Sequence, residues 1–396
     1  MPTKPKQTLV HLYLGLLTII AEGYRLVLSS VGRTKRRAGP YRIVLLVSRP
    51  QDVELLIGLH DQARSRKELA LSVWILEKCA RRFPDVLPLL KGKGVVVDQT
   101  VNYVRLLKIP QELMRADGFL STVESTAAKH KLPYILTRMA NAAGIATYTL
   151  QHGFENIGLT YRDQIHGPEV KFAARTILTW GPTTELPSWV QKETRDKAIA
   201  VGCPKKFAIV ENKPSEKTGE RPIVGVFDNL HWHRYDENYR SAFLRDLQAI
   251  ADQRREFRFI LKSHPVSVRK RDKDLAATLR SMDNLEVADL CESGKAWTTP
   301  WLLSKALGVI TTPSTIALDG ALARVPVAVT RYGLELDYYR PLSLFDSIED
   351  WHGFLDGLTE EVGTGRLKLQ GERFVDRVLV SGDPSQKILD LMVGRP

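Results

Sequence analysis

Two segments in the second half of the chain combine residue types that could hold a phosphate group. Residues 259–265 read Phe-Ile-Leu-Lys-Ser-His-Pro, and residues 309–320 run from Val-Ile-Thr-Thr-Pro-Ser-Thr into Ile-Ala-Leu-Asp-Gly. Each is an apolar, strand-like run that ends in small or polar residues where a helix is expected to begin. In a parallel α/β sheet, ligands bind beyond the carboxyl ends of the strands, where helix N-termini offer free backbone N–H groups to phosphate. The two segments therefore predict a binding site for the phosphate of an activated donor.

Within this predicted donor site, three side chains have distinct expected tasks. An N–H of His264 beside the phosphate would stabilise the leaving nucleotide. Ser314 or Thr315 would begin the next helix, where it either caps backbone N–H groups or binds an anion, and the segment alone does not separate the two. The other residues of the predicted donor site are Lys262, Pro265 and Arg269.

Two carboxylates at predicted strand ends are candidates for acid–base or nucleophilic chemistry. Glu155 closes the segment 151–155 (Gln-His-Gly-Phe-Glu), which directly follows an apolar run and contains a glycine that permits a tight turn. Glu155 could take a proton from an attacking hydroxyl, or its turn could simply hydrogen-bond the backbone. Asp228 closes the first apolar run of the second half and could act as base, nucleophile or acceptor for substrate hydroxyls, or cap the next turn. The acceptor side of the predicted site consists of Gln151, His152 and Gly153.

No metal site is expected. His231, His233 and Asp236 lie close together in the sequence, but their spacing matches no defined ligand set. The three cysteines lie far apart with no CxxC pair, which favours a reducing compartment and argues against a disulfide framework or a zinc site. We therefore expect neither a metal nor a cofactor besides the donor substrate.

The elements that would position these residues alternate between apolar runs and helix-like segments in both halves. This alternation is typical of buried parallel strands in βαβ units, and it predicts an α/β fold with two Rossmann-like, doubly wound sheets facing a cleft. No GxGxxG and no GxxxxGK[ST] motif occurs, so neither nucleotide fingerprint supports the phosphate site. Residues 342–344 and 351–358 have the pattern of a helical remainder. The expected strands are 41–48, 71–76, 95–97, 118–123, 146–151, 177–180, 198–201, 223–227, 257–262, 285–288, 309–311 and 327–330. The expected domains are an N-terminal helix and basic linker over 1–40, an acceptor domain over 41–207, a polar linker over 208–221 and a nucleotide-donor domain over 222–396.

The charge of the chain indicates an acidic partner. Its 57 Lys and Arg outnumber 45 Asp and Glu, for a formal net charge of +12. Residues 9–28 are apolar but interrupted by Glu22 and Arg25, so the uncharged run is shorter than the ~20 residues that span a bilayer. The basic run 33–37 follows, which fits an interfacial helix on an anionic leaflet, or alternatively a helix packed on the first domain. The scattered tryptophans show no basic–aromatic interleaving, so no nucleic-acid partner is expected. We expect a cytoplasmic protein, peripheral at the inner face of the cytoplasmic membrane.

Taken together, these motifs resemble bacterial glycosyltransferases of the GT-B architecture. More narrowly, they resemble the retaining β-Kdo transferases of capsule and O-antigen synthesis, where Kdo is 3-deoxy-D-manno-octulosonic acid. Bacterial sialyltransferases and the glycerophosphate polymerases of teichoic acid synthesis share the His-Pro and Ser-rich elements, so these elements define a broad clan. The resemblance covers roughly residues 41–358 and depends on Gln151-His152-Gly153 with Glu155, on Asp228, on His264-Pro265 and on Ser314-Thr315.

The resemblance implies transfer of Kdo from CMP-Kdo to a lipid-linked or growing surface glycan. It implies that His264, Ser314 and Thr315 hold the donor phosphate and cytidine, and that Glu155 assists the acceptor. Asp228 would attack the anomeric carbon in a retaining double displacement, although inversion by direct attack of the acceptor stays open. The alternatives are a CMP-sialic acid sialyltransferase, a CDP-glycerol phosphotransferase, a UDP-sugar 2-epimerase and a basic nucleic-acid-binding protein. Whether the chain is one module of a larger synthase also stays open.

Overall fold

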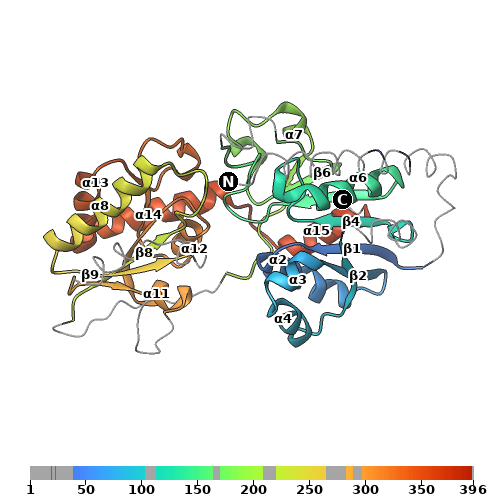
Figure 1. The fold of residues 1–396 in the computed structure, drawn as a ribbon, viewed down its shortest axis with the longest axis horizontal. Coiled ribbons are helices and arrows are strands. Elements are labelled where there is room, and N and C mark those ends of the chain that lie inside the picture. Colours follow the sequence, from blue (N-terminus) through green and yellow to red (C-terminus); the bar gives the residue numbers. More distant parts are fainter. Residues whose placement is uncertain are drawn as a thin grey trace, which may run out of the picture.

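A computed structural model describes residues 19, 23, 39–102, 113–163, 170–207, 220–264, 282–288 and 297–394. They form two parallel β-sheets with flanking helices, which confirms the predicted pair of doubly wound α/β sheets. In Figure 1 the blue and green elements of the first half lie beside the yellow and orange elements of the second half. Four expectations concern residues outside the described ranges: the apolar segment 9–28 apart from residues 19 and 23, most of the linker 208–221, Pro265 and Arg269.

The first sheet has seven strands in the order β3-β2-β1-β4-β5-β6-β7, and every neighbouring pair is parallel. The strand order reverses between β1 and β4, and such switch points are where α/β folds bind ligands. All four residues of β4 are buried, as expected of a strand covered on both faces. The strands are β1 (Tyr41–Val47), β2 (Leu69–Leu76), β3 (Val97–Val101), β4 (Gly118–Ser121), β5 (Ala146–Leu150), β6 (Thr176–Thr179) and β7 (Ala198–Ala200).

The second sheet repeats this plan with six parallel strands in the order β10-β9-β8-β11-β12-β13. Its switch point lies between β8 and β11, and every residue of β8 is buried. The ends of β8, β9 and β11 are therefore the expected ligand side of this half. The strands are β8 (Ile223–Asp228), β9 (Arg258–Ser263), β10 (Leu285–Val287), β11 (Ala306–Thr311), β12 (Val327–Thr330) and β13 (Ser343–Phe345).

Helices connect the strands and cover both sheets. The start of α2 shows how the sequence sets such a boundary: Pro50 occupies the first turn, and the Asp52 carboxylate accepts the backbone N–H groups of Ser48 and Arg49. The helices are α2 (Pro50–Arg64), α3 (Glu77–Arg82), α4 (Val86–Gly92), α6 (Lys131–Ala142), α7 (Lys192–Asp196), α8 (Glu237–Gln253), α11 (Thr299–Lys305), α12 (Ile316–Leu322), α13 (Ile348–Thr359), α14 (Glu361–Val378) and α15 (Pro384–Val393). Short 3-10 turns cover Ala128–His130, Thr183–Glu185 and Asp337–Tyr339.

Two elements differ from the sequence expectation, and both lie at sheet edges. Residues 342–344 were expected to be helical, but Ser343–Phe345 forms β13, which pairs with β12. The strand expected over 95–97 instead begins at Val97 and runs to Val101, and its first four residues are partly or fully exposed. Edge strands are short and half-solvated, so they lack the continuous apolar run that marks a central strand.

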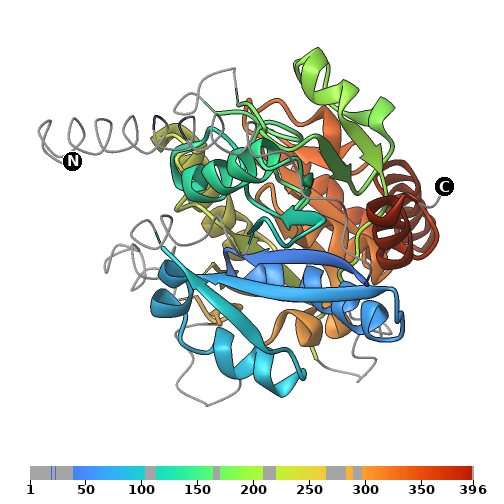
Figure 2. The same ribbon diagram turned by 90° about the vertical axis from the view of Figure 1, so that its right-hand side faces the viewer.

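The last helix packs on the first half, although the sequence predicts residues 222–396 as one domain. Helix α15 contacts α2, and Arg66 of the first half forms an ion pair with Asp390 at 2.7 Å. Just before α15, the N–H of Val380 donates to the carbonyl of Trp180 at 3.0 Å. In Figure 2, where the first half faces the viewer, this dark red helix lies against that half. The chain therefore crosses between the halves twice.

Candidate functional site

The turn after β5 is held in shape by its first residue, Gln151. The side chain of Gln151 is buried; its Oε1 accepts the Trp180 backbone N–H at 3.0 Å, and its Nε2 donates to the Gly153 carbonyl at 2.9 Å. Both ends of the amide are thus used within the first half. In this structure Gln151 shapes the turn that presents the following residues to the second half.

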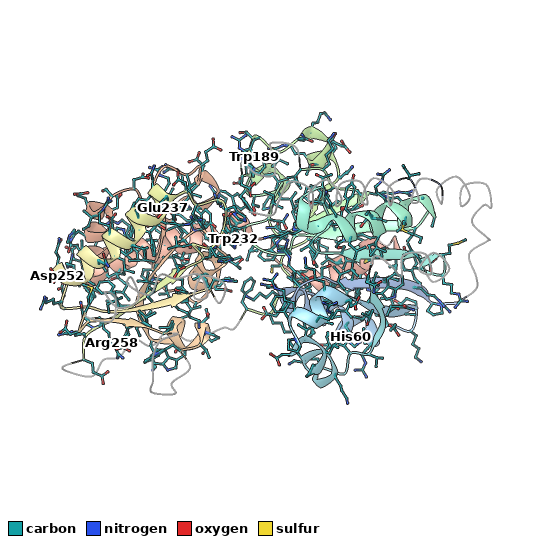
Figure 3. The ribbon with its side chains drawn as sticks, viewed as in Figure 1. His60, Trp189, Trp232, Glu237, Asp252 and Arg258 are labelled. Atoms are coloured by element: carbon teal, nitrogen blue, oxygen red, sulfur yellow. The ribbon has the colours of Figure 1, made fainter. Side chains whose placement is uncertain are left out.

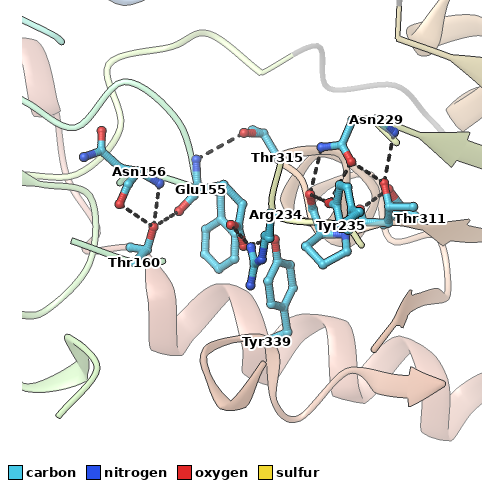
Figure 4. A network of polar contacts seen from close by, with 12 residues as sticks. Glu155, Asn156, Thr160, Asn229, Arg234, Tyr235, Thr311, Thr315 and Tyr339 are labelled. Carbon is cyan, nitrogen blue, oxygen red and sulfur yellow. Dashed lines mark hydrogen bonds and ion pairs between the residues drawn. The ribbon is translucent and has the colours of Figure 1, made fainter. Parts of the chain in front are cut away.

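Glu155, which ends this turn, forms a buried ion pair with Arg234 of the second half. The Tyr339 hydroxyl donates to Glu155 Oε1 at 2.6 Å, so two residues of the second half hold one carboxylate of the first (Figure 4). Burial raises the pKa of Glu155 above its ordinary value, against the opposing effects of Arg234 and the Tyr339 hydroxyl. Glu155 therefore links the two halves, and it can take a proton from an acceptor only where that link opens.

Phe154 gives the same turn an apolar contact with the second half. Its ring stacks on Tyr338 with centroids 4.7 Å apart, and it meets Tyr339 and Phe374 edge-on at 5.0 and 5.3 Å. Its backbone N–H donates to Thr315 Oγ1 at 3.1 Å. The hydroxyl of Thr315, predicted to hold donor phosphate, thus bonds the turn of the other half in this structure.

Asp228 and His264 lie together at the ends of β8 and β9. One oxygen of the Asp228 carboxylate, Oδ2, accepts a hydrogen bond from the Ser263 hydroxyl. The other, Oδ1, accepts the backbone N–H of Leu230 at 3.2 Å. The backbone carbonyl of Asp228 accepts the N–H of His264 at 2.8 Å. The His264 ring stacks on His231 with centroids 4.4 Å apart. This region therefore presents a buried carboxylate held by two hydrogen bonds, and a pair of stacked imidazoles from neighbouring segments.

Ser314 lies three residues beyond the end of β11, the strand that neighbours β8. Its Oγ accepts the N–H of Ile316 at 3.3 Å and lies 3.0 Å from Thr311 Oγ1, so its hydroxyl bonds within the turn before α12. The N-cap residue of α12 is Thr315, whose side chain makes no cap hydrogen bond. Lys262 is partly exposed on β9 of the same sheet.

A neutral polar network joins the ends of β8 and β11, and sequence reasoning missed it. The Asn229 Oδ1 accepts the hydroxyls of Tyr235 at 2.7 Å and Thr312 at 2.6 Å. Its Nδ2 donates to the Pro313 carbonyl at 3.0 Å, and its backbone N–H donates to Thr312 Oγ1 at 3.1 Å (Figure 4). The one sequence feature that could have indicated this network is the position of Asn229 directly after β8.

His152, expected on the acceptor side, belongs to a separate cluster in the first half. The Nε2 atom of His152 lies 3.4 Å from Nη1 of Arg49. The second terminal nitrogen of that guanidinium, Nη2, lies 2.7 Å from Nε2 of His130. Burial and the Arg49 charge lower the pKa of His152 to about 3, so this imidazole is neutral at physiological pH. Arg49 and His130 were not predicted, although Arg49 lies two residues after β1, much as His264 lies one residue after β9.

Aromatic side chains lie between the two groups of polar residues. Tyr161 of the first half packs on Trp232 of the second with ring centroids 5.7 Å apart, and the Arg234 guanidinium lies 5.2 Å from the Tyr161 ring centroid. Figure 3 shows Trp232 between the halves, whereas Asp252 and Arg258 lie at the far end of the second half. Phe154 and Glu155 of the turn thus contact the second half directly, whereas His152 belongs to the cluster around Arg49.

Comparison with known proteins identifies the fold and leaves the sequence family open. No protein-family model matches the sequence, and no curated protein is detectably similar to it in sequence. A UDP-GlcNAc 2-epimerase from Neisseria meningitidis, solved with UDP-GlcNAc, matches with a TM-score of 0.59 and 11% identity over 89% of this chain and 100% of that one. A glycosyltransferase from Rickettsia africae matches with a TM-score of 0.57 and 12% identity over 90% and 98%. MurG from Acinetobacter baumannii matches with a TM-score of 0.51 and 12% identity over 89% and 99%.

These likenesses and the sheet order define the class of fold. Two parallel Rossmann-like sheets and a C-terminal helix that returns to the first half are the GT-B architecture, which the sequence motifs predicted. At 11–12% identity the likeness establishes the fold and no activity. Among the described residues, no helix combines the length and apolarity needed to cross a membrane.

Proposed function

We propose that this protein is a nucleotide-sugar-dependent glycosyltransferase. The observation that carries the proposal is the gathering of Asp228, His264 and Ser314 at the ends of three adjacent strands, opposite the turn 151–155 of the other half. Strand ends at a switch point are the ligand side of such sheets. The structural likeness to a glycosyltransferase and to MurG supports the same class.

Within this class we propose CMP-Kdo as donor and a lipid-linked or growing surface glycan as acceptor. The support is the set of sequence motifs, together with the placement of His264 beside Asp228. The donor phosphate would lie near His264, Ser314 and Thr315, with Lys262 and Arg269 adding positive charge. We propose no metal and no cofactor for this reaction, and a location at the inner face of the cytoplasmic membrane, which the net charge of +12 supports.

Asp228 is the proposed nucleophile of a retaining transfer. One carboxylate oxygen would attack the anomeric carbon while the bond from that carbon to the CMP phosphate oxygen breaks and its electron pair leaves with CMP. The acceptor hydroxyl would then displace the carboxylate and lose its proton to a base, for which Glu155 is the proposed group once released from Arg234. The bonds from Ser263 and the Leu230 N–H, which fix the Asp228 carboxylate, support this role.

A second candidate, a UDP-sugar 2-epimerase, is favoured by the likeness to a UDP-GlcNAc 2-epimerase solved with its substrate. An epimerase would change a UDP-sugar without any acceptor, whereas a transferase releases its nucleotide in proportion to acceptor glycosylated. Sialyl transfer from CMP-sialic acid and glycerophosphate transfer from CDP-glycerol are the alternatives within the transferase clan.

The test offers CMP-Kdo, CMP-sialic acid, CDP-glycerol and UDP-GlcNAc, each with and without glycan acceptors. Acceptor-dependent release of CMP from CMP-Kdo alone is the expected result, with NMR of the product reporting the anomeric configuration. Conversion of UDP-GlcNAc without acceptor would replace transfer by epimerisation.

The role of Asp228 is tested in the same assay. Asp228→Ala and Asp228→Asn should abolish transfer while CMP still binds, and Asp252→Asn, on the exposed end of α8, should retain activity. Turnover by either Asp228 variant would remove the nucleophile assignment.

A further inference from the structure

Three residues of the first half, two of them just beyond strand ends, form a compact basic cluster. Arg49 follows β1, His130 lies in the 3-10 turn before α6, and His152 follows β5. A guanidinium carries donors only, so the Nε2 atoms of both histidines accept from Arg49, at 2.7 Å for His130 and 3.4 Å for His152. His130 can then donate through Nδ1 to Ser125 Oγ, which lies 2.7 Å away. Both imidazoles are therefore neutral, and Arg49 supplies the charge of the cluster.

In the described part of the chain, no carboxylate forms a direct ion pair with Arg49. The charge of the nearby Asp52 carboxylate acts to raise the pKa of Arg49, but burial outweighs it. Asp52, three residues on, directs its Oδ2 to the backbone N–H groups of Ser48 and Arg49 at 2.7 and 2.8 Å. Burial lowers the pKa of Arg49, because a charge removed from water is unfavourable unless an anion or dipoles compensate it. The cluster is thus electrostatically incomplete.

Buried polar atoms without hydrogen-bond partners gather at the same strand ends. Within the described ranges, Ser48 Oγ and Ser121 Oγ are inaccessible to solvent and lack a hydrogen-bond partner. Ser48 follows β1 and Ser121 ends β4, and these two strands are neighbours in the sheet. Buried polar groups in folded proteins nearly always have partners, so two unpartnered hydroxyls on neighbouring strands, one of them next to Arg49 in the chain, favour a polar ligand at these strand ends.

We propose that Arg49, His130 and His152 form a subsite that binds an anionic group, a phosphate or a carboxylate, of the acceptor. The assignment of this anionic group to the acceptor rests on the proposed transferase function, whereas the binding of an anion does not. The cluster lies on the first sheet, whereas the residues of the proposed donor site, His264, Ser314 and Thr315, belong to the second half. A guanidinium suits this task because its donors match the oxygens of phosphate and carboxylate in pairs.

The subsite is tested by titrating the full-length, ¹⁵N-labelled protein with inorganic phosphate and, separately, with acetate. The ring nitrogens of its nine histidines are followed by NMR, and His130→Gln and His152→Gln variants assign the two signals. Saturable shifts of His130 and His152 are expected, and the better of the two anions identifies the acidic group. If neither ring signal shifts with either anion, the proposal is overturned. This experiment uses the wild-type Arg49, so it does not depend on an Arg49 variant that folds.

Two variants test the guanidinium itself. Arg49→Met should weaken anion binding about tenfold or more, since a hydrogen-bonded charge is lost, and Arg49→Lys should lie between Met and wild type because an ammonium cannot reach both imidazoles in one plane. Backbone capping of α2 by Asp52 is kept in both variants, and thermal unfolding checks that they fold. Equal affinity in wild type and Arg49→Met would overturn the proposal.

The assignment to the acceptor has its own outcomes. CMP and UDP should leave the His130 and His152 signals unchanged; competition of either nucleotide with phosphate would assign the subsite to the donor and overturn the acceptor role. With an active donor, Arg49→Met should raise KM for an acidic acceptor about tenfold or more while KM for the donor stays constant. Phosphate binding without any transferase activity would refute the proposed function and leave the anion subsite standing, whereas transferase activity with an unchanged acceptor KM would refute the acceptor role alone.

Discussion

The strand ends of the two sheets carry different kinds of polar groups. In the second sheet, Asn229 exchanges hydrogen bonds with Thr312 and accepts the Tyr235 hydroxyl, so a neutral network joins β8 to β11. In the first sheet, Arg49 donates to two neutral imidazoles and meets no ion-pair partner among the described residues. Buried hydroxyls without partners lie beside it. One region is thus satisfied without a ligand, and the other is not.

This difference indicates which region is shaped before ligand binding and which is completed by it. A fully bonded network holds its side chains in place, so Asp228 and His264 lie on a rigid frame. A cation with unpartnered neighbours gains stability from each anionic atom that enters. The turn 151–155 lies between the two regions, because Glu155 bonds the second half while His152 belongs to the first.

The largest expected effect comes from breaking the link between the regions. Arg234→Met leaves the buried Glu155 carboxylate without its counter-ion, and the loss of one partner of a buried ion pair costs about 3–5 kcal/mol. We expect the free energy of unfolding in urea to fall by that amount.

The matched control is the double variant Glu155→Gln/Arg234→Met, which removes both charges. It should be more stable than Arg234→Met, since no unpaired charge stays buried, and the double-mutant cycle gives the coupling energy. A cost of less than about 1 kcal/mol for the single variant would show that the pair is not buried in solution.

The sequence predicts the frame of the second region well. Central parallel strands such as β8, β9 and β11 are buried on both faces, so their sequences are continuous apolar runs. Asp228 ends β8, His264 follows β9 and Ser314 lies three residues after β11. The same rule also selects Arg49 after β1, but an arginine there reads equally as surface charge. Its role depends on two histidines that no local pattern connects to it.

The contacts between the halves could not be predicted from local sequence patterns. Glu155 pairs with Arg234, which is 79 residues away, and with Tyr339, which is 184 residues away. These partners depend on how the two sheets pack together. The return of α15 to the first half is hidden for the same reason, because its amphipathic pattern shows that it is buried but not on which sheet.

The next effect is a pH dependence of stability that arises in the first half. Glu124, in the loop after β4, accepts the N–H groups of Ala173 and Ala174, and burial raises its pKa from 4.5 to about 7. Between these values the folded state holds a proton that the unfolded state has released, so stability is highest below pH 4.5 and falls as the pH rises toward 7. Glu124→Gln should flatten this part of the profile in urea unfolding at a series of pH values. An unchanged slope would contradict the raised pKa.

The smallest effects compare one hydroxyl from each region. Tyr235→Phe removes a buried hydroxyl that donates to Asn229 at 2.7 Å, so unfolding should become easier by about 1–2 kcal/mol. Ser121→Ala removes a buried hydroxyl that has no partner in the described structure, so stability should stay within about 0.5 kcal/mol or rise, because an unsatisfied group is lost. Urea unfolding of both variants without added anions measures the difference. Equal losses would mean that both strand ends are already satisfied in the free protein, whereas a phosphate-dependent loss confined to Ser121→Ala would place that hydroxyl on the bound anion.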